Sequence, residues 1–128
     1  MNTNYRSKGR RGFTLTELII VVAIIGLLAT LAVPSMAKAR DNSRLNVIYG
    51  NLRVLEHAKD QWALDNRATD GTEVGDLSVL QDYLRYGGIA SVVHETYVPN
   101  AVGTNAQANL PTGVGLGPYG PGAAIVLP

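Results

Sequence analysis

The segment Arg10-Arg11-Gly12-Phe13-Thr14-Leu15-Thr16-Glu17 leads directly into the apolar run from Leu18 to Val33, and this junction decides the architecture of the chain. The run has 16 residues, of which only Thr30 is polar, and the next charge is Lys38, five residues after it ends. A helix needs about 20 such residues to cross a bilayer. A soluble protein would have to bury this run in a large core, which the remaining residues hardly provide. We therefore expect this segment to enter a membrane.

The charges before the run predict the orientation of the segment. The first twelve residues contain four bases and no acid, whereas the whole chain has a net charge of only +1. These bases are Arg6, Lys8, Arg10 and Arg11. A basic tip before an apolar helix is typically retained in the cytoplasm. No second basic cluster accompanies it, so we predict no contact with nucleic acid. The chain has no cysteine, which excludes disulfides and thiolate metal sites.

Two kinds of export signal also begin with a basic tip and an apolar run. A secretory signal has a short apolar core and a small-residue cleavage site, for which Ala37-Lys38-Ala39 is available. The alternative function is thus an exported periplasmic binding domain whose cleavable signal ends near Ala39. A twin-arginine signal would use Arg10-Arg11. The length of the apolar run and the carboxylate of Glu17 at its threshold argue against a secretory signal. The strong hydrophobicity of the run, and the lack of a cofactor-binding pattern after it, argue against a twin-arginine signal.

Gly12 and the following Phe13-Thr14-Leu15-Thr16-Glu17-Leu18 resemble the processing and anchor segment of type IV pilins and type II secretion pseudopilins. In that family a membrane peptidase cuts after the glycine and methylates the new terminal amine. The resemblance implies a cut between Gly12 and Phe13, methylation of Phe13, and a leader of 12 residues. The family's glutamate, fifth after the cut, is Glu17, and its helix-bending proline, the twenty-second, is Pro34.

The resemblance implies a structural subunit of a type IV pilus-like filament or a type II secretion pseudopilus, with a minor or competence-type pseudopilin as the alternative within this class. Its expected partners are the prepilin peptidase, an inner-membrane assembly platform and other pilins, in a homo-oligomeric or mixed filament. It would cross the inner membrane once, with a cytoplasmic N-terminus and a periplasmic head. The resemblance implies that Glu17 pairs with the Phe13 amine of a neighbouring subunit, because packed helices would take the carboxylate into a drier place where it needs a counter-ion. Pro34 would kink or locally melt the helix.

After residues 13–36, which form the apolar helix, residues 37–66 are predicted to continue it as an amphipathic helix. Apolar residues recur there at steps of three and four, which is typical of one buried helix face. They are Leu45, Ile48, Leu52, Leu55, Ala58 and Trp62. The charged residues are expected off that face, namely Arg44, Arg53, Glu56, Lys59 and Asp60.

Residues 67–128 are predicted to form a small head, so that the chain is an α+β protein with a long N-terminal helix and an antiparallel β head. A short helix containing Leu77, Leu80 and Leu84 is expected, capped by Asp76 and ended by Gly87-Gly88. Three short strands are expected at residues 89–98, 106–110 and 123–127. The glycine- and proline-rich residues 113–122 indicate an irregular loop.

The head offers no catalytic constellation. His57 and His94 are isolated in the sequence, and no nucleophile or phosphate-binding motif is present, so no enzyme activity is predicted. Major pseudopilins often bind calcium in the head, and Asp70, Glu73 and Asp76 are candidate ligands. Their spacing does not match an EF-hand. We therefore predict an acidic loop, with no metal and no other cofactor.

Mass spectrometry of the mature N-terminus separates the two readings of this segment. Prepilin-type processing predicts a mature chain that begins with methylated Phe13. A cleaved secretory signal predicts an unmodified Arg40 instead. Finding Arg40, or an intact Met1, would contradict the filament interpretation.

Overall fold

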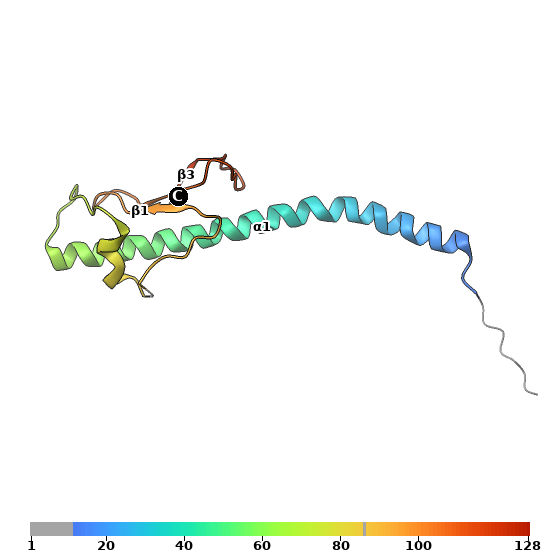
Figure 1. Ribbon diagram of the computed structural model, residues 1–128, viewed down its shortest axis with the longest axis horizontal. Helices are drawn as coiled ribbons and strands as arrows, with labels where there is room; N and C mark the ends of the chain where they lie inside the picture. The colour runs from blue at the N-terminus through green and yellow to red at the C-terminus, as the bar shows by residue number, and fades with distance from the viewer. Residues whose placement is uncertain (1–11, 86) are drawn as a thin grey trace, which may run out of the picture. The chain divides into compact units, whose positions relative to one another are not determined.

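A computed structural model of the chain describes residues 12–85 and 87–128. Its elements are the helix α1 (Leu15–Asn66), the 3₁₀ helix η1 (Leu77–Tyr83) and three strands (Figure 1). The strands are β1 (Thr96–Val98), β2 (Gln107–Asn109) and β3 (Ala124–Val126). The chain divides into two compact units, one up to Met36 and one from Ala37 onwards. The predicted α+β class, with a long apolar N-terminal helix and a small antiparallel sheet, is confirmed.

In the second unit, α1 carries the core of the head on one face. Leu45, Ile48, Leu52, Leu55 and Ala58 are all buried, as their spacing predicted. Full burial of a leucine or isoleucine side chain contributes about 1.5–3 kcal/mol, so this row contributes substantially to the stability of the head. The last predicted member of the row, Trp62, is only partly buried, and Ala63 beside it is buried instead. α1 ends at Asn66, where the amphipathic pattern ends.

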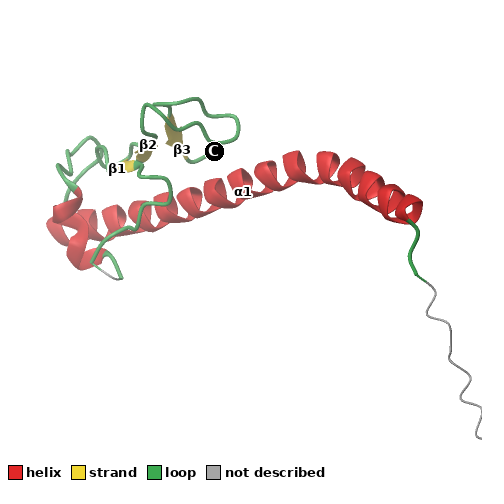
Figure 2. Ribbon diagram, turned by 45° about the vertical axis from the view of Figure 1, so that its right-hand side comes forward, coloured by secondary structure: helices red, strands yellow, loops and turns green. Residues whose placement is uncertain are grey.

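The sheet packs its central row against this face of α1. β2 pairs antiparallel with β1 on one side and with β3 on the other. The three strands are labelled in Figure 2. The partners Tyr97, Ala108 and Ile125 lie side by side and are all buried. Their strand neighbours are half-buried or exposed, because successive side chains in a strand point to opposite faces.

The strand predicted at residues 89–98 is wrong over most of its length, because β1 covers only Thr96–Val98. The cause is Glu95, which is 5% exposed and whose carboxylate turns back onto its own chain. It accepts hydrogen bonds from the backbone N–H groups of Val92 and Val93 at 2.8–3.0 Å. These bonds hold residues 92–94 in a bend, and an extended backbone there would break them.

Glu95 also joins this bend to the helix. The Tyr97 hydroxyl donates to the Glu95 carboxylate at 2.7 Å, and the Asn51 side-chain amide donates to the Tyr97 oxygen at 2.8 Å. Asn51 donates further to the Ala90 carbonyl oxygen at 3.1 Å. Burial by itself raises the pKa of Glu95, but the hydrogen bonds from Val93, Tyr97 and Val92 outweigh it, and the pKa of Glu95 lies below its usual value of 4.5.

The short helix of the head is present as the 3₁₀ helix η1, with Asp76 as its N-cap, as predicted. The Asp76 carboxylate accepts from the Leu77 N–H at 2.7 Å. The predicted stop at Gly87-Gly88 is wrong, because the helix ends at Tyr83. Leu84 already has an extended backbone and donates its N–H to the Gln81 carbonyl oxygen, which closes the last turn. Its side chain is buried, so core packing sets this end.

The prediction that Lys59 and Glu56 lie off the packed face is also wrong. Lys59 is 1% exposed, and its ammonium donates to the carbonyl oxygens of Pro99 and Thr104. It forms an ion pair with Glu56 at 3.0 Å, and the Glu56 carboxylate in turn accepts the backbone N–H of Ala106. The pair therefore ties the segment between β1 and β2 to α1. Buried charges are tolerated only when they are paired and hydrogen-bonded in this way.

Replacing Lys59 with methionine keeps most of the aliphatic stem and removes the charge. We expect Lys59→Met to lower the free energy of unfolding by about 3–5 kcal/mol, since it removes the positive partner of the partly buried Glu56 carboxylate and the donor to two carbonyl oxygens. Urea unfolding monitored by the fluorescence of Trp62, the only tryptophan, measures the loss. The exposed Arg53→Met serves as the control and should change the stability by no more than about 0.5 kcal/mol. Equal losses in both variants would contradict the structural role of Lys59.

The lowered pKa of Glu95 predicts a pH dependence of stability. Because its pKa is lower in the folded than in the unfolded chain, its contribution is fully present above about pH 4.5 and is lost as the pH falls through the folded value. Unfolding of the wild type and of Glu95→Gln should be compared between about pH 7 and about pH 3. The wild type should lose more stability on acidification than the variant. Parallel losses would show that Glu95 does not carry this dependence.

Candidate functional site

The backbone at the predicted cut is not helical. Gly12, Phe13 and Thr14 precede α1, which begins at Leu15. The Phe13 side chain is 78% exposed, and nothing lies within 4 Å of the position that a Cβ on Gly12 would occupy. Exposed, irregular backbone is the form that proteases bind most readily. The leader charges, at Arg6, Lys8, Arg10 and Arg11, lie outside the described residues.

Glu17 is part of a reciprocal cap at the start of α1. Its carboxylate accepts from the Thr14 N–H at 2.9 Å and from the Thr14 hydroxyl at 2.7 Å. The Glu17 N–H donates back to the Thr14 hydroxyl oxygen at 3.2 Å. This is a capping box, which satisfies backbone donors that the first helical turn leaves unpaired. It explains why the helix begins at Leu15 rather than at Phe13.

The role of Thr14 was missed in the sequence analysis, although Thr14-Leu15-Thr16-Glu17 before an apolar run is the pattern typical of this cap. Within a single copy, the Glu17 charge is thus stabilised by the cap and by the positive end of the helix dipole. Glu17 forms no ion pair with any other described residue. Its pairing with a Phe13 amine stays a prediction, because that amine would belong to another copy.

The apolar run has no cover within the described chain. Every residue from Gly12 to Arg40 is exposed, including large side chains such as Leu31 at 72% and Val33 at 68%. Among the described residues, α1 is the one helix long and apolar enough to cross a membrane. An uncovered apolar helix of this kind supports association with a membrane.

Gly26 and Pro34 do not interrupt the helix. α1 is continuous through both positions, so the predicted local melting at Pro34 is not present. A proline removes one backbone donor and leaves the donors around it in place. One turn earlier, the Thr30 hydroxyl donates to the Leu27 carbonyl oxygen at 2.7 Å. The predicted role of Pro34 in assembly stays a prediction.

The structure gives the candidate polar residues of the head separate positions. His57 and His94 are exposed, and they lie on α1 and before β1 respectively. Asp76 is engaged as the cap of η1, whereas Asp70 and Glu73 are exposed. Within residues 12–85 and 87–128, no group of three or more histidine, aspartate or glutamate side chains is placed to hold a metal ion.

Comparison with known proteins assigns the N-terminal motif. Residues 7–33 match the family model of the prokaryotic N-terminal methylation motif. Type II secretion system core protein G of Klebsiella michiganensis is 37% identical over 70 residues, which cover 55% of this chain and 49% of that protein. The protein of the same name from Pseudomonas aeruginosa is 39% identical over 64 residues, which cover 50% of this chain and 45% of that protein.

A type IV pilin is similar over a shorter stretch. Type IV major pilin protein PilA of Myxococcus xanthus is 49% identical over 52 residues, which cover 41% of this chain and 24% of that protein. The chain thus matches about half of the length of the secretion proteins and a quarter of the pilin. No solved structure gives a significant match. The chain carries the prokaryotic N-terminal methylation motif, and over about half of its length it is homologous to type II secretion system core protein G.

Proposed function

We propose that this chain is a structural subunit of a type IV pilus-like filament or of a type II secretion pseudopilus. The observation that carries the proposal is the methylation motif over residues 7–33. This motif includes the apolar part of α1, which no other part of the described chain covers. In a membrane, lipid would cover this helix, and in a filament, the helices of other subunits would do so. Names of the related proteins point to the same two assemblies.

The chain would consist of four segments with different roles. Residues 1–12 would be the leader, with Arg6, Lys8, Arg10 and Arg11 retained at the cytoplasmic face of the inner membrane. Residues 13–36 would form the membrane and assembly helix, residues 37–66 the amphipathic half of α1, and residues 67–128 the rest of the periplasmic head. The chain would cross the membrane once. Prepilin peptidase would cut between Gly12 and Phe13 and methylate Phe13, and an assembly platform would then add the subunit to a filament of pilins.

Cleavage would create the charge that Glu17 needs in a filament. The peptidase releases one amine at Phe13 per subunit, and Glu17 supplies one carboxylate. When helices pack closely, the carboxylate leaves water and requires a positive partner. An offset between subunits would leave one charge buried and unpaired, so the pair would set their axial register. In the free subunit the cap with Thr14 would hold the carboxylate until such a partner arrives.

The alternative function, an exported periplasmic binding domain, is less well supported. Its cleavage site, Ala37-Lys38-Ala39, lies inside α1, and the helix continues for a further 27 residues to Asn66. Proteases act preferentially on exposed loops rather than within helices. The related proteins are a secretion-system core protein and a pilin by name, which favours a structural subunit over an enzyme or a ligand-binding domain.

A pair of substitutions at Glu17 tests this proposal. Glu17→Ala should be cleaved and methylated at Phe13 like the wild type, but filament yield should fall by more than about tenfold, because a buried terminal amine is left unpaired. Glu17→Gln separates the charge from the helix cap, since glutamine also serves in a capping box. Mass spectrometry measures processing, and electron microscopy with sedimentation of sheared filaments measures assembly.

The glutamine variant decides between the two roles of the residue. If the charge pairs with Phe13, Glu17→Gln should be as defective in assembly as Glu17→Ala. Normal filaments from Glu17→Gln would remove the pairing role and leave Glu17 as a helix cap. A wild-type chain that keeps its leader and forms no filament would overturn the proposed function itself.

A further inference from the structure

The first turns of α1 in the second unit directly follow the apolar run. Lys38 comes two positions after Met36, the last residue of the first unit, within one continuous helix. The headgroup layer of a bilayer is about 5–8 Å thick on each side. Residues 37–42 extend over about 8 Å at 1.5 Å per residue. When the apolar run crosses a membrane, these residues therefore lie among the lipid headgroups.

The charges of the second unit are unevenly distributed along the chain. Residues 37–44 hold three bases and one acid, whereas residues 45–128 hold four bases and eight acids. The one acid of the first group, Asp41, is paired with Arg44 at 3.9 Å. Lys38 and Arg40 are exposed and form no ion pair with any described residue. The part of the head that directly follows the apolar run is therefore basic, and the remainder is acidic.

A pocket of about 340 Å³, which we call the Lys38 pocket, lies between this basic segment and a turn from the far end of the sequence. Lys38, Asp41 and Asn42 line it from α1, where steps of three and four residues place them on one face. Gly117 and Pro118 complete it. An ammonium and a side-chain amide are both donors that a phosphate group accepts. The pocket thus has the donors that an anionic group requires.

The turn at Gly117-Pro118 is fixed to α1. The backbones on either side of it exchange two hydrogen bonds, at 2.8 and 3.0 Å. Gly117 has a positive φ of 58°, and a Cβ there would come within 2.8 Å of the Leu45 side chain. The hydroxyls of Tyr119 and Tyr49 are hydrogen-bonded at 3.0 Å. The turn therefore depends on a glycine that lies directly on the helix, and the Lys38 pocket is a fixed feature of the head.

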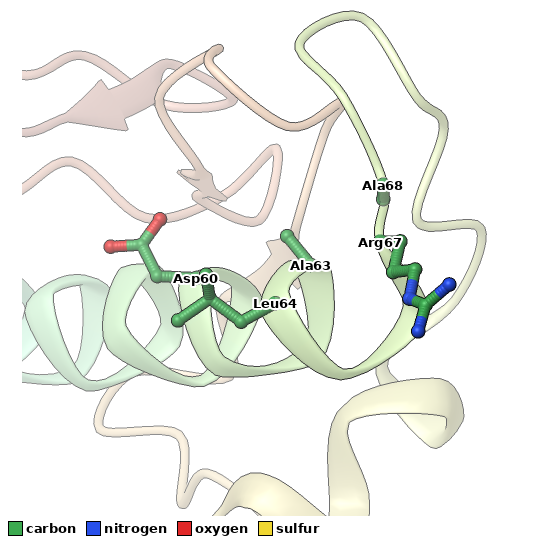
Figure 3. A pocket seen from close by; sticks show the side chains of 5 residues that line it. All are labelled: Asp60, Ala63, Leu64, Arg67 and Ala68. Atoms are coloured by element: carbon green, nitrogen blue, oxygen red, sulfur yellow. The ribbon is translucent and has the colours of Figure 1, made fainter.

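A second pocket, of about 410 Å³ near the end of α1, offers no comparable site for an anion. Figure 3 shows its charged side chains, with the Asp60 carboxylate and the Arg67 guanidinium extended away from each other. Asp60 forms no ion pair with any described residue, so its charge would repel an anion. It also lies 22 residues beyond Lys38, about 33 Å further along the helix from the apolar run. Of these two pockets, the Lys38 pocket is the one that suits an anionic headgroup.

We propose that the Lys38 pocket binds the phosphate of an anionic phospholipid in the bilayer that the apolar run crosses, with the Gly117-Pro118 turn in contact with neighbouring headgroups. The Lys38 ammonium would pair with the phosphate, and the Asn42 amide would donate to a headgroup oxygen. Arg40 would add to the attraction, since each base near an anionic membrane surface strengthens binding roughly fivefold.

This contact rests on the proposed function, because it requires α1 to be inserted in a membrane. It concerns the subunit before assembly and is independent of Glu17 and Phe13. Lipid binding at a fixed pocket would hold the head at the bilayer surface in a defined orientation. The contact would break when a filament takes up the subunit and the helix leaves the bilayer.

Fluorescence of the full-length chain in lipid vesicles tests the contact. The chain has no cysteine, so Gly120→Cys places a single environment-sensitive label next to the turn, at an exposed position with nothing within 4 Å of a Cβ. In vesicles of equal parts phosphatidylglycerol and phosphatidylcholine, acrylamide should quench this label about twofold less than in pure phosphatidylcholine. A label at Ser78→Cys, exposed on η1, is the control and should be quenched equally in both.

Substitutions of two bases on α1 assign the effect to the pocket. Lys38→Glu should abolish the difference between the two kinds of vesicle, because it places a second carboxylate beside Asp41. Lys38→Arg keeps the charge and should retain the difference. Arg53→Glu makes the same charge change at an exposed position 15 residues further along α1, and it should also retain the difference. Circular dichroism should show the same helix content in all variants.

The outcomes separate the lipid contact from the proposed function. Protection that requires both phosphatidylglycerol and Lys38 would support the contact. Equal quenching in both vesicles, or equal losses in Lys38→Glu and Arg53→Glu, would overturn it and leave the proposed function intact. The same protection from inorganic phosphate added to phosphatidylcholine vesicles would assign the pocket to a free anion and overturn the lipid contact as well.

The proposed function fails in a different way. A wild-type chain that keeps its leader and forms no filament would overturn the filament role, whereas the vesicle result would still support the lipid contact. A chain that does not insert into the vesicles at all would overturn both.

Discussion

The apolar surface of residues 18–33 has no partner within the described chain, and this constraint governs the behaviour of the rest of the molecule. A continuous apolar helix surface of this size is unfavourable in water, because the free energy of the chain rises with the apolar area that stays exposed to solvent. Lipid or other helices must therefore cover it. Glu17 stands at the threshold of this segment, and its cap with Thr14 allows a charge to remain there without an external partner.

The head depends on the same helix in a different way. Its apolar row from Leu45 to Ala58 forms the helix side of the core, and two polar side chains on α1 bind the loops. Lys59 binds the carbonyl oxygens of the segment between β1 and β2, and Asn51 binds Tyr97 and the Ala90 carbonyl oxygen. Hydrophobic burial is not directional, whereas these hydrogen bonds require defined positions. Each of the three strands is only three residues long, so the polar contacts contribute much of the positioning of the loops that connect them.

Sequence patterns predicted the elements whose cause is local. The buried row on α1, its end at Asn66, the Asp76 cap and the presence of three short strands all followed from periodicity, capping residues and turn residues. Two of the incorrect predictions, the exposure of Lys59 and the end of η1, have a non-local cause. Lys59 is buried because its ammonium binds the carbonyl oxygens of Pro99 and Thr104, about 40 residues later in the chain. No sequence pattern within α1 predicts these contacts. β1 is short because Glu95 folds back onto Val92 and Val93, and η1 ends early because Leu84 enters the core.

By itself, the sequence determined where the helix is apolar, where it is amphipathic, and which residues match the methylation motif, because these are properties of neighbours along the chain. Only the tertiary structure determined which charged side chains remain available to an external partner. Glu56, Lys59 and Asp60 are close together in the sequence, yet Lys59 is buried, Glu56 is half-buried and Asp60 is exposed at a pocket. Helical spacing assigns a side chain to a face, but only the segments that pack there determine whether its charge is neutralised within the molecule or remains for a partner.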